Sequence, residues 1–256
     1  IFGESAGAMT TCAFLVSPRT KGLFSSALLQ SIGCGWLQTP KRTAEAQGER
    51  LAEALGCTGA EDPLPCMRTA SKQEVVDALG ETEPYYAIVD GSLIPKAVGD
   101  AIYAGEFHHV PIVAGVNEDE GTMFTHHWGI DSETKLHEAL QNWGRAYSIW
   151  DIATLKTLYS VDEYGDPQRA FDQFYGDLFF HCMTRYFLSN ASAFTDTYAY
   201  YYTHEPSWIP YYPSLEGWGA YHSAELTFVF GTNQELLPAY EQAFSKQVSE
   251  MWHRFG

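Results

Sequence analysis

The fold of this chain is decided by residues 1–15, which read IFGESAGAMTTCAFL. Their centre, from Gly3 to Gly7, has the form G-x-S-x-G, which is typical of a strand, a sharp turn that carries a serine, and a helix. Both glycines are small enough to let the strand and the helix approach each other. The turn lifts the Ser5 hydroxyl clear of the sheet, and the N–H of Ala6 points to where a substrate carbonyl oxygen becomes negative. The motif predicts a serine hydrolase with Ala6 as an oxyanion donor, and the alternative is a turn without chemistry.

An acid and a base are expected downstream, because hydrolases with this elbow order their triad Ser, then Asp or Glu, then His. Residues 110–116 (VPIVAGV) read as a buried strand. The polar loop after it carries three carboxylates, Glu118, Asp119 and Glu120, and by composition alone any of them can serve as the acid. His222 lies in a glycine-rich stretch (GWGAYHSAEL) and can reach a serine across the sheet edge. It would take the serine's proton during attack and return it to the leaving alcohol, while the acid fixes its tautomer.

Further short words of sequence occur in a consistent order along nearly the whole chain. They are FGESAG at 2–7, LQS at 29–31, VDG at 89–91, VP at 110–111, GVN with DEG at 115–121, and YH with E and FVFG at 221–231. In these words the chain resembles the type-B carboxylesterase family, which includes the cholinesterases and some fungal lipases. The resemblance implies an α/β-hydrolase fold and a cofactor-free carboxylic-ester hydrolase that works through an acyl-enzyme. It also implies Ser5 as nucleophile, Glu120 as acid and His222 as base, and only the resemblance selects Glu120 over its two neighbours.

The resemblance suggests two substrate-binding residues as well. Glu4, beside the nucleophile, favours cationic substrates in the choline-cleaving relatives, and a hydrogen-bonded structural carboxylate is the alternative. Trp36 falls where the family often places an aromatic residue of the acyl pocket, although a core tryptophan would look the same. The family also includes cell-adhesion molecules that have lost the nucleophile, so a non-catalytic binding protein is the alternative function. The presence of all three triad residues favours the hydrolase.

The chain contains five cysteines. The resemblance implies a disulfide between Cys57 and Cys66, since the family carries one in that loop. Such a short loop would stabilise the fold by about 2–3 kcal/mol when closed. Cys12, in the apolar helix after the elbow, is expected to be a small buried hydrophobic residue. Cys34 and Cys182 are left unassigned, although in some relatives a cysteine at position 182 pairs with one further along than this chain extends.

Composition excludes several classes of protein. The 256 residues are 45% hydrophobic and 15% aromatic, which suits one large domain and excludes disorder and coiled coils. A formal charge of −17 argues against nucleic-acid or anionic-membrane partners. It favours a soluble secreted protein over steering of cationic ligands. The histidine pairs at 108–109 and 126–127 lack a metal-ligand spacing, so we expect solvated loop histidines and no metal.

The expected compartment is secreted or extracellular, and the sequon at Asn190 is compatible with a glycoprotein. No apolar run of transmembrane length and no signal peptide is present in the sequence. The oligomeric state and the identity of the ester stay open.

Strands and helices are expected to alternate, as in an α/β domain. We expect strands at 26–31, 110–116 and 198–203, and helices at 43–55, 71–79, 132–143, 152–158 and 235–255. Residues 1–256 are interpreted as one partial α/β-hydrolase catalytic domain, the C-terminal portion of the central sheet with its flanking helices. The resemblance implies that the rest of the sheet, and a glycine-rich loop with further oxyanion donors, lie outside this fragment. Each missing donor costs on the order of 3–4 kcal/mol in the transition state, so the chain alone is expected to be poorly active.

Overall fold

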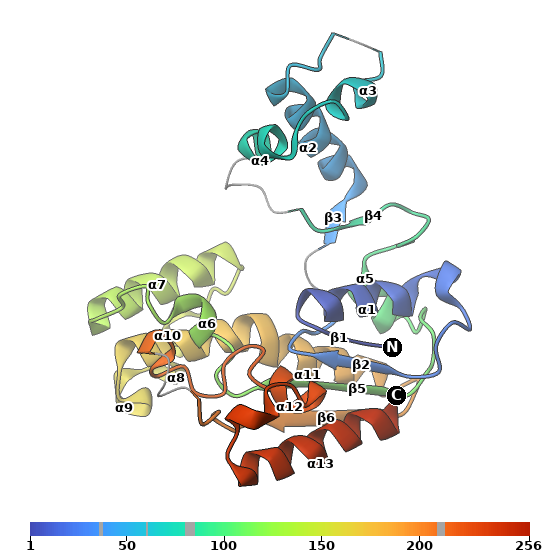
Figure 1. Cartoon of the computed structure of the whole chain (residues 1–256). Coiled ribbons are helices and arrows are strands. Elements are labelled where there is room, and N and C mark those ends of the chain that lie inside the picture. The colour runs from blue at the N-terminus through green and yellow to red at the C-terminus, as the bar shows by residue number, and fades with distance from the viewer. Residues whose placement is uncertain (36–37, 60, 80–84, 209–212) are drawn as a thin grey trace.

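The computed structural model describes residues 1–35, 38–59, 61–79, 85–208 and 213–256. Its centre is a parallel sheet that lies between two layers of helices (Figure 1). Four strands follow one another across this sheet: β1 (Phe2–Glu4), β2 (Ala27–Gln30), β5 (Ile112–Asn117) and β6 (Thr197–Tyr202). The expected α/β class with a parallel sheet is therefore confirmed.

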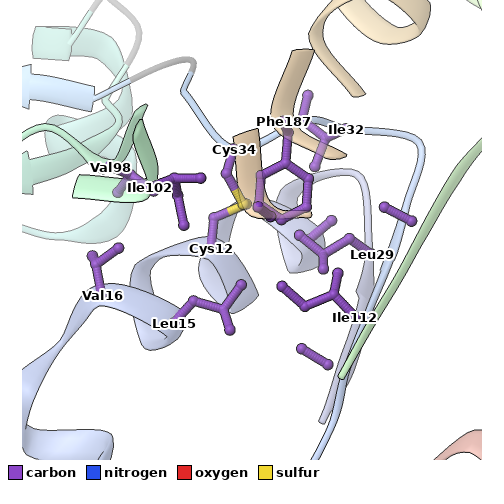
Figure 2. Close-up of a cluster of buried hydrophobic side chains, with 14 of the residues drawn as sticks. Cys12, Leu15, Val16, Leu29, Ile32, Cys34, Val98, Ile102, Ile112 and Phe187 are labelled. Atoms are coloured by element: carbon purple, nitrogen blue, oxygen red, sulfur yellow. A yellow bond between two sulfur atoms is a disulfide. The ribbon is translucent and has the colours of Figure 1, made fainter. Parts of the chain in front are cut away.

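The two helical layers pack against apolar residues at alternate positions of the strands. The layer above the sheet in Figure 1 contains α1 (Ala6–Val16), α5 (Val98–Tyr103) and α11 (Cys182–Ala191). Its core includes Leu15, Leu29, Ile112 and Phe187, all fully or almost fully buried (Figure 2). The layer below contains α12 (Leu226–Phe230) and α13 (Ala239–Phe255).

A third group of helices lies beyond the carboxyl end of β5. It consists of α6 (Thr122–Thr125), α7 (Glu133–Ala146), α8 (Ile152–Leu158), α9 (Val161–Tyr164) and α10 (Pro167–Gly176). A π-helical turn, Asp177–His181, joins α10 directly to α11. Helices α7 to α10 each begin after a residue whose side chain accepts a hydrogen bond from the first turn, namely Ser132, Asp151, Ser160 and Asp166. Their starts are thus encoded locally.

A smaller lobe projects from the sheet (Figure 1). It contains β3 (Gln38–Pro40), α2 (Lys41–Ala54), α3 (Leu64–Met67), α4 (Lys72–Leu79) and β4 (Ala87–Val89), with β3 and β4 paired in parallel. The disulfide implied by the resemblance, Cys57–Cys66, is present and joins the loop after α2 to α3. It closes this loop within a lobe whose helices contribute few buried residues.

The expectation for Cys12 is wrong in one respect. Its side chain is buried, as expected, but it forms a disulfide with Cys34 (Figure 2). The bond connects α1 with the segment after β2, in the middle of the apolar core. Cys182 is a free, exposed cysteine. Sequence reasoning missed the Cys12–Cys34 pair because proximity of residues 22 positions apart depends on how α1 packs on the sheet.

The expected helices and strands agree with the structure to within a few residues at their ends. The last helix begins later than expected, at Ala239, because Pro238 precedes it and a short 3₁₀ turn covers Gln234–Leu236. The sequence patterns do not predict the continuous helical segment from α10 to α11. Among the described helices, none combines the length and the apolar character needed to cross a bilayer.

The two glycines of the elbow have different roles. A Cβ atom on Gly3 would lie 2.3 Å from the backbone carbonyl of Gly7. A Cβ atom on Gly7 would meet no described atom within 4 Å. The sequence predicts that both positions must be small, and within the described residues the close approach of strand and helix requires this only of Gly3.

Replacing Gly3 by Ala should therefore destabilise the protein by about 2–4 kcal/mol, because neither backbone can move away without disturbing the elbow. The matched change Gly7→Ala should alter the free energy of unfolding by less than about 1 kcal/mol, since it lies in a helix and meets open space. Denaturant unfolding of both variants measures this. Equal losses at the two glycines would contradict the interpretation.

Candidate active site

Ser5 occupies a strained turn at the carboxyl end of β1. Its backbone has φ 53° and ψ −116°, an uncommon conformation for a residue with a side chain. The Ser5 N–H donates to the carbonyl of Gln30 on β2 at 2.9 Å, and its own carbonyl accepts from Met9 in α1 at 3.0 Å. The strand, the turn and the helix thus hold the serine as the motif predicts.

Glu120 and His222 form a buried pair beyond the end of β5. The Nδ1 atom of His222 lies 2.6 Å from Oε2 of Glu120, and the side chains are 3% and 0% exposed. The other carboxylate oxygen, Oε1, accepts from the backbone N–H of Asn117 at 2.8 Å. Because a carboxylate only accepts, Nδ1 carries a proton and donates it, which leaves Nε2 as the nitrogen that can exchange protons.

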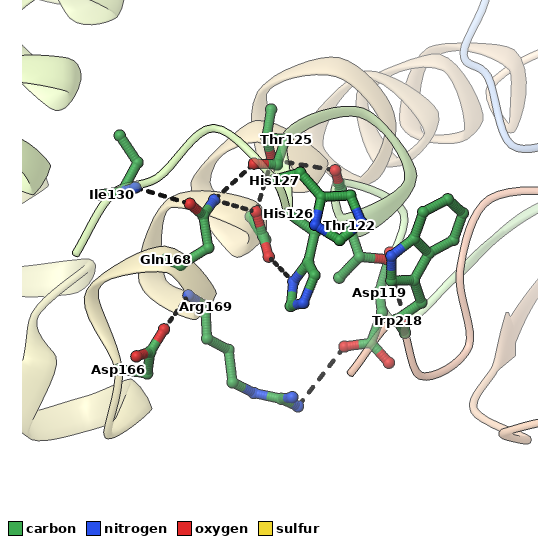
Figure 3. Close-up of polar contacts among 12 residues, drawn as sticks. Asp119, Thr122, Thr125, His126, His127, Ile130, Asp166, Gln168, Arg169 and Trp218 are labelled. Carbon is green, nitrogen blue, oxygen red and sulfur yellow. Dashed lines mark hydrogen bonds and ion pairs between the residues drawn. The ribbon is translucent and has the colours of Figure 1, made fainter. Parts of the chain in front are cut away.

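The two other carboxylates of this loop do not contact His222. Asp119 accepts from the backbone N–H of Ala220 at 2.9 Å and lies 3.6 Å from the guanidinium of Arg169 (Figure 3). The backbone N–H of Glu118 donates to the carbonyl of Tyr202. Of the three candidates that composition leaves open, the structure brings only Glu120 to the imidazole.

The loop that carries His222 is held in place by the segment after β5. Thr122 donates to the carbonyl of Trp218 at 2.8 Å (Figure 3). The Asn117 side chain donates to the carbonyl of Tyr221 at 2.8 Å. Asp119 and Tyr221 also form a parallel bridge. These bonds cross about a hundred residues of sequence, so the position of His222 is a tertiary property.

Ser5 lines a cavity, and His222 lies behind two aromatic residues of the cavity wall. The structure shows a cavity of about 270 Å³ at Ser5, and two of its lining residues, Phe124 and Phe180, have ring centroids 5.1 and 4.9 Å from the imidazole of His222. Nε2 of His222 lies 3.2 Å from Oε1 of Glu4, the residue before Ser5. Within the described residues, no hydrogen bond joins the Ser5 hydroxyl to His222.

The cavity wall is aromatic and carries no charged side chain among its described lining residues. Seven rings line it: Tyr86, Phe124, Trp143, Tyr147, Tyr175, Phe179 and Phe180. Glu4 is not part of this wall, since its carboxylate contacts the imidazole. Trp36, the other suggested substrate-binding residue, lies outside the described residues. The Ala6 N–H is at the start of α1, and no described acceptor bonds it.

Buried carboxylates surround the imidazole. Glu225, three residues after His222, accepts from the side chains of Gln30 at 2.8 Å and Asn117 at 2.7 Å. Burial raises the pKa of Glu225 to about 7, against the lowering effect of the Asn117 bond. Burial lowers the pKa of His222, but the bond and charge of Glu120 outweigh burial, so the pKa lies above its ordinary value.

Sequence reasoning gave no role to Gln30, Asn117 or Glu225. The available signal was polar side chains at the ends of two apolar strands, Gln30 after Leu29 and Asn117 after Val116.

The histidine pairs bind protein groups. His108 bonds the Ser17 carbonyl at 2.7 Å, and His126 lies 3.0 Å from the buried Asp172. Both are half-buried, so the expectation of solvated histidines is wrong for them, whereas His109 and His127 are exposed. In the described part of the chain, no group of three or more His, Cys, Asp or Glu residues is arranged to hold a metal ion.

Comparison with known proteins agrees with the resemblance. The sequence model described as "Carboxylesterase family" matches residues 1–256. The chain is 27% identical over 285 aligned residues to an acetylcholinesterase of Bungarus fasciatus, which covers all of this chain and 46% of that protein. It is 28% identical over 283 residues to the pyrethroid hydrolase Ces2a of Mus musculus, covering all of this chain and 49% of that protein. The chain thus spans about half the length of these curated relatives.

The raised pKa of Glu225 makes stability depend on pH. Between pH 4.5, the ordinary pKa of glutamate, and about pH 7, Glu225 holds a proton in the folded protein that it releases in the unfolded chain. The free energy of unfolding therefore falls as the pH rises through this range. Relative to wild type, Glu225→Gln should therefore gain about 2–3 kcal/mol of unfolding free energy between about pH 5 and pH 8. Denaturant unfolding at both pH values measures it. The exposed Glu235→Gln is the control and should show no such trend, and a flat difference for Glu225→Gln would refute the prediction.

Proposed function

This chain belongs to the carboxylesterase family and has its α/β-hydrolase fold, and we propose that the protein containing it hydrolyses carboxylic esters with the triad Ser5, His222 and Glu120. The observation that carries the proposal is the buried Glu120–His222 pair, which leaves Nε2 of the imidazole beside the segment that holds Ser5. A strained serine that lines a cavity and a base oriented by a carboxylate are what acyl transfer requires.

The reaction has two halves. In the first, Nε2 of His222 accepts the Ser5 proton as the Ser5 oxygen attacks the ester carbonyl. The Ala6 N–H stabilises the negative oxygen of the tetrahedral intermediate, and Glu120 stabilises the protonated imidazole. His222 then gives the proton to the leaving alcohol, which leaves an acyl-enzyme on Ser5. In the second half, water attacks the acyl group by the same proton transfers, and the acid is released.

Further oxyanion donors come from the part of the protein that this chain does not include. A single N–H donor at Ala6 gives partial stabilisation, and each further donor contributes on the order of 3–4 kcal/mol. The chain by itself is therefore a poor catalyst, and activity belongs to the full-length protein.

The substrate is an uncharged or cationic ester of small to medium size. The uncharged aromatic wall of the cavity suits apolar groups, and cationic groups can lie against aromatic faces. The carboxylates of Glu4, Glu120 and Glu225 around the imidazole disfavour an anionic substrate. The relatives are named for different activities, so no individual ester is proposed as the substrate.

The protein is proposed to be secreted or extracellular. Two disulfides, Cys12–Cys34 and Cys57–Cys66, suit an oxidising compartment. Asn190, the candidate glycosylation site, lies in α11, where its side-chain amide donates to the Tyr186 carbonyl at 2.7 Å. A glycan there would replace this bond.

An organophosphate probe tests the nucleophile. Incubating the full-length protein with the probe should add one covalent label, which peptide mass spectrometry locates on Ser5. The Ser5→Ala variant should take up no label and lose turnover of a chromogenic ester, while its melting temperature stays close to wild type because the hydroxyl serves chemistry. A folded protein without a label on Ser5 would favour the non-catalytic binding protein instead.

Replacement of the acid tests the triad. Glu120→Gln should lower kcat by about 10⁴-fold, because the amide no longer holds the correct tautomer of His222. Glu118→Gln is the matched control on the same loop and should change kcat little. Steady-state kinetics on an uncharged ester compares them, and a larger loss at Glu118 would reassign the acid.

A further inference from the structure

A second histidine–carboxylate pair, half-buried, lies beside the end of β5 that also contacts the proposed acid, and the mechanism above does not use it. It consists of Asp177 and His181, the two ends of the π-helical turn between α10 and α11. The imidazole of His181 is 14% exposed and packs against the end of β5. Single π-helical turns inside helices occur often at functional sites, and this one places Asp177 and His181 on each other's hydrogen-bonding atoms.

The hydrogen bonds of His181 determine its protonation. Nδ1 lies 2.6 Å from Oδ1 of Asp177, and Nε2 lies 2.8 Å from the carbonyl oxygen of Asn117. A carbonyl only accepts, and so does an ionised carboxylate. The Asp177 carboxylate also accepts from the Tyr159 hydroxyl at 2.8 Å and the Gln173 amide at 3.0 Å, so both of its oxygens act as acceptors. Both ring nitrogens of His181 therefore donate, and the ring is a cation.

This cation is connected to Glu120 by one residue. The Asn117 carbonyl accepts from His181, while the Asn117 N–H donates to Oε1 of Glu120. Both side chains also lie against Gly176, where a Cβ atom would lie 3.6 Å from Cε1 of His181 and 3.7 Å from Cβ of Glu120. Through Asn117, His181 thus helps to fix the Oε1 side of the Glu120 carboxylate, whose Oε2 atom contacts His222.

We propose that His181 is a positioning residue of the triad: a half-buried imidazolium that orients Glu120 through Asn117 and offsets the negative charge around His222. The proposal rests on the proposed function for its kinetic consequence, although the protonation of His181 stands apart from it. Without such a cation, the imidazole of His222 would face Glu4, Glu120 and Glu225 without compensation, and it would hold its proton too tightly to act as a base.

The groups that face His181 agree with a cationic ring. Burial opposes its protonation, but the bonds to Asp177 and Asn117 and the charges of Asp177 and Glu120 raise the pKa of His181 above its ordinary value. From β6, the ring of Tyr201 lies edge-on at 5.9 Å. The charge of His181 also lowers the pKa of Asp119, against the dominant effect of burial.

The first experiment reads the protonation state directly. The full-length protein is labelled with ¹⁵N-histidine, and the His181 signals are assigned by their loss in His181→Gln. Two protonated ring nitrogens should be present at about pH 7.5, one unit above the ordinary pKa of histidine. A neutral ring with one N–H at that pH would overturn the proposal, and this measurement does not need an active enzyme.

The second experiment measures the effect on His222. In His181→Gln, the lost cation should raise the apparent pKa of His222, so the acid limb of kcat/KM for an uncharged ester should move to higher pH by about 0.5–1. His181→Lys restores a charge and should move the limb back toward wild type. The matched control is His137→Gln, which breaks an exposed pair with Glu133 at the same i, i+4 spacing and should leave the limb unchanged.

The outcomes separate this proposal from the proposed function. If His181→Gln lowers kcat without moving the limb, His181 has a structural role only and the proposal fails. If the full-length protein proves inactive toward esters, an NMR titration of His222 in wild type and His181→Gln gives the same test. A rise in the His222 pKa supports the proposal, and an unchanged or lowered value overturns it.

Discussion

The buried hydrogen bond between Glu120 and His222 is the constraint on which the rest of the site depends. Burying a carboxylate and an imidazole away from water is costly unless each polar atom finds a partner. Here Glu120 has the Asn117 N–H on one oxygen and His222 on the other. The pair can form only where the end of β5 and the loop before α12 meet, so the packing of the sheet determines the chemistry.

Asn117 connects the parts of this site. Its N–H bonds Glu120, its carbonyl accepts from His181, and its side-chain amide donates to Glu225 and to the Tyr221 carbonyl. One residue at the end of a strand thus reaches the acid, the loop of the base and the cluster behind them. A residue with so many buried bonds cannot shift without leaving several polar groups unpaired, which makes the end of β5 rigid.

The sequence predicts well what local patterns encode. The elbow around Ser5 follows from its motif, and the strand β5 follows from its apolar run. The helices α7 and α8 are likewise expected at nearly their observed bounds. Residues 167–191 show what such patterns miss: neither the π-helical turn nor α11 begins with a side-chain cap, so no local signal marks where these segments start. The Cys12–Cys34 bond and the need for smallness at Gly3 alone are tertiary facts that spacing cannot give.

The choice of Glu120 among three neighbouring carboxylates illustrates the same limit at the site. Composition gives Glu118, Asp119 and Glu120 equal standing, and a one-residue difference decides which side chain turns toward the imidazole. In the structure Asp119 accepts a hydrogen bond from the Ala220 N–H and pairs with Arg169. The Ala220 bond holds the loop that carries His222. Asp119 thus holds the loop of His222, and Glu120 holds its imidazole ring. A carboxylate that anchors the backbone of the base is as necessary to the geometry as the acid itself, and only three-dimensional contacts distinguish the two.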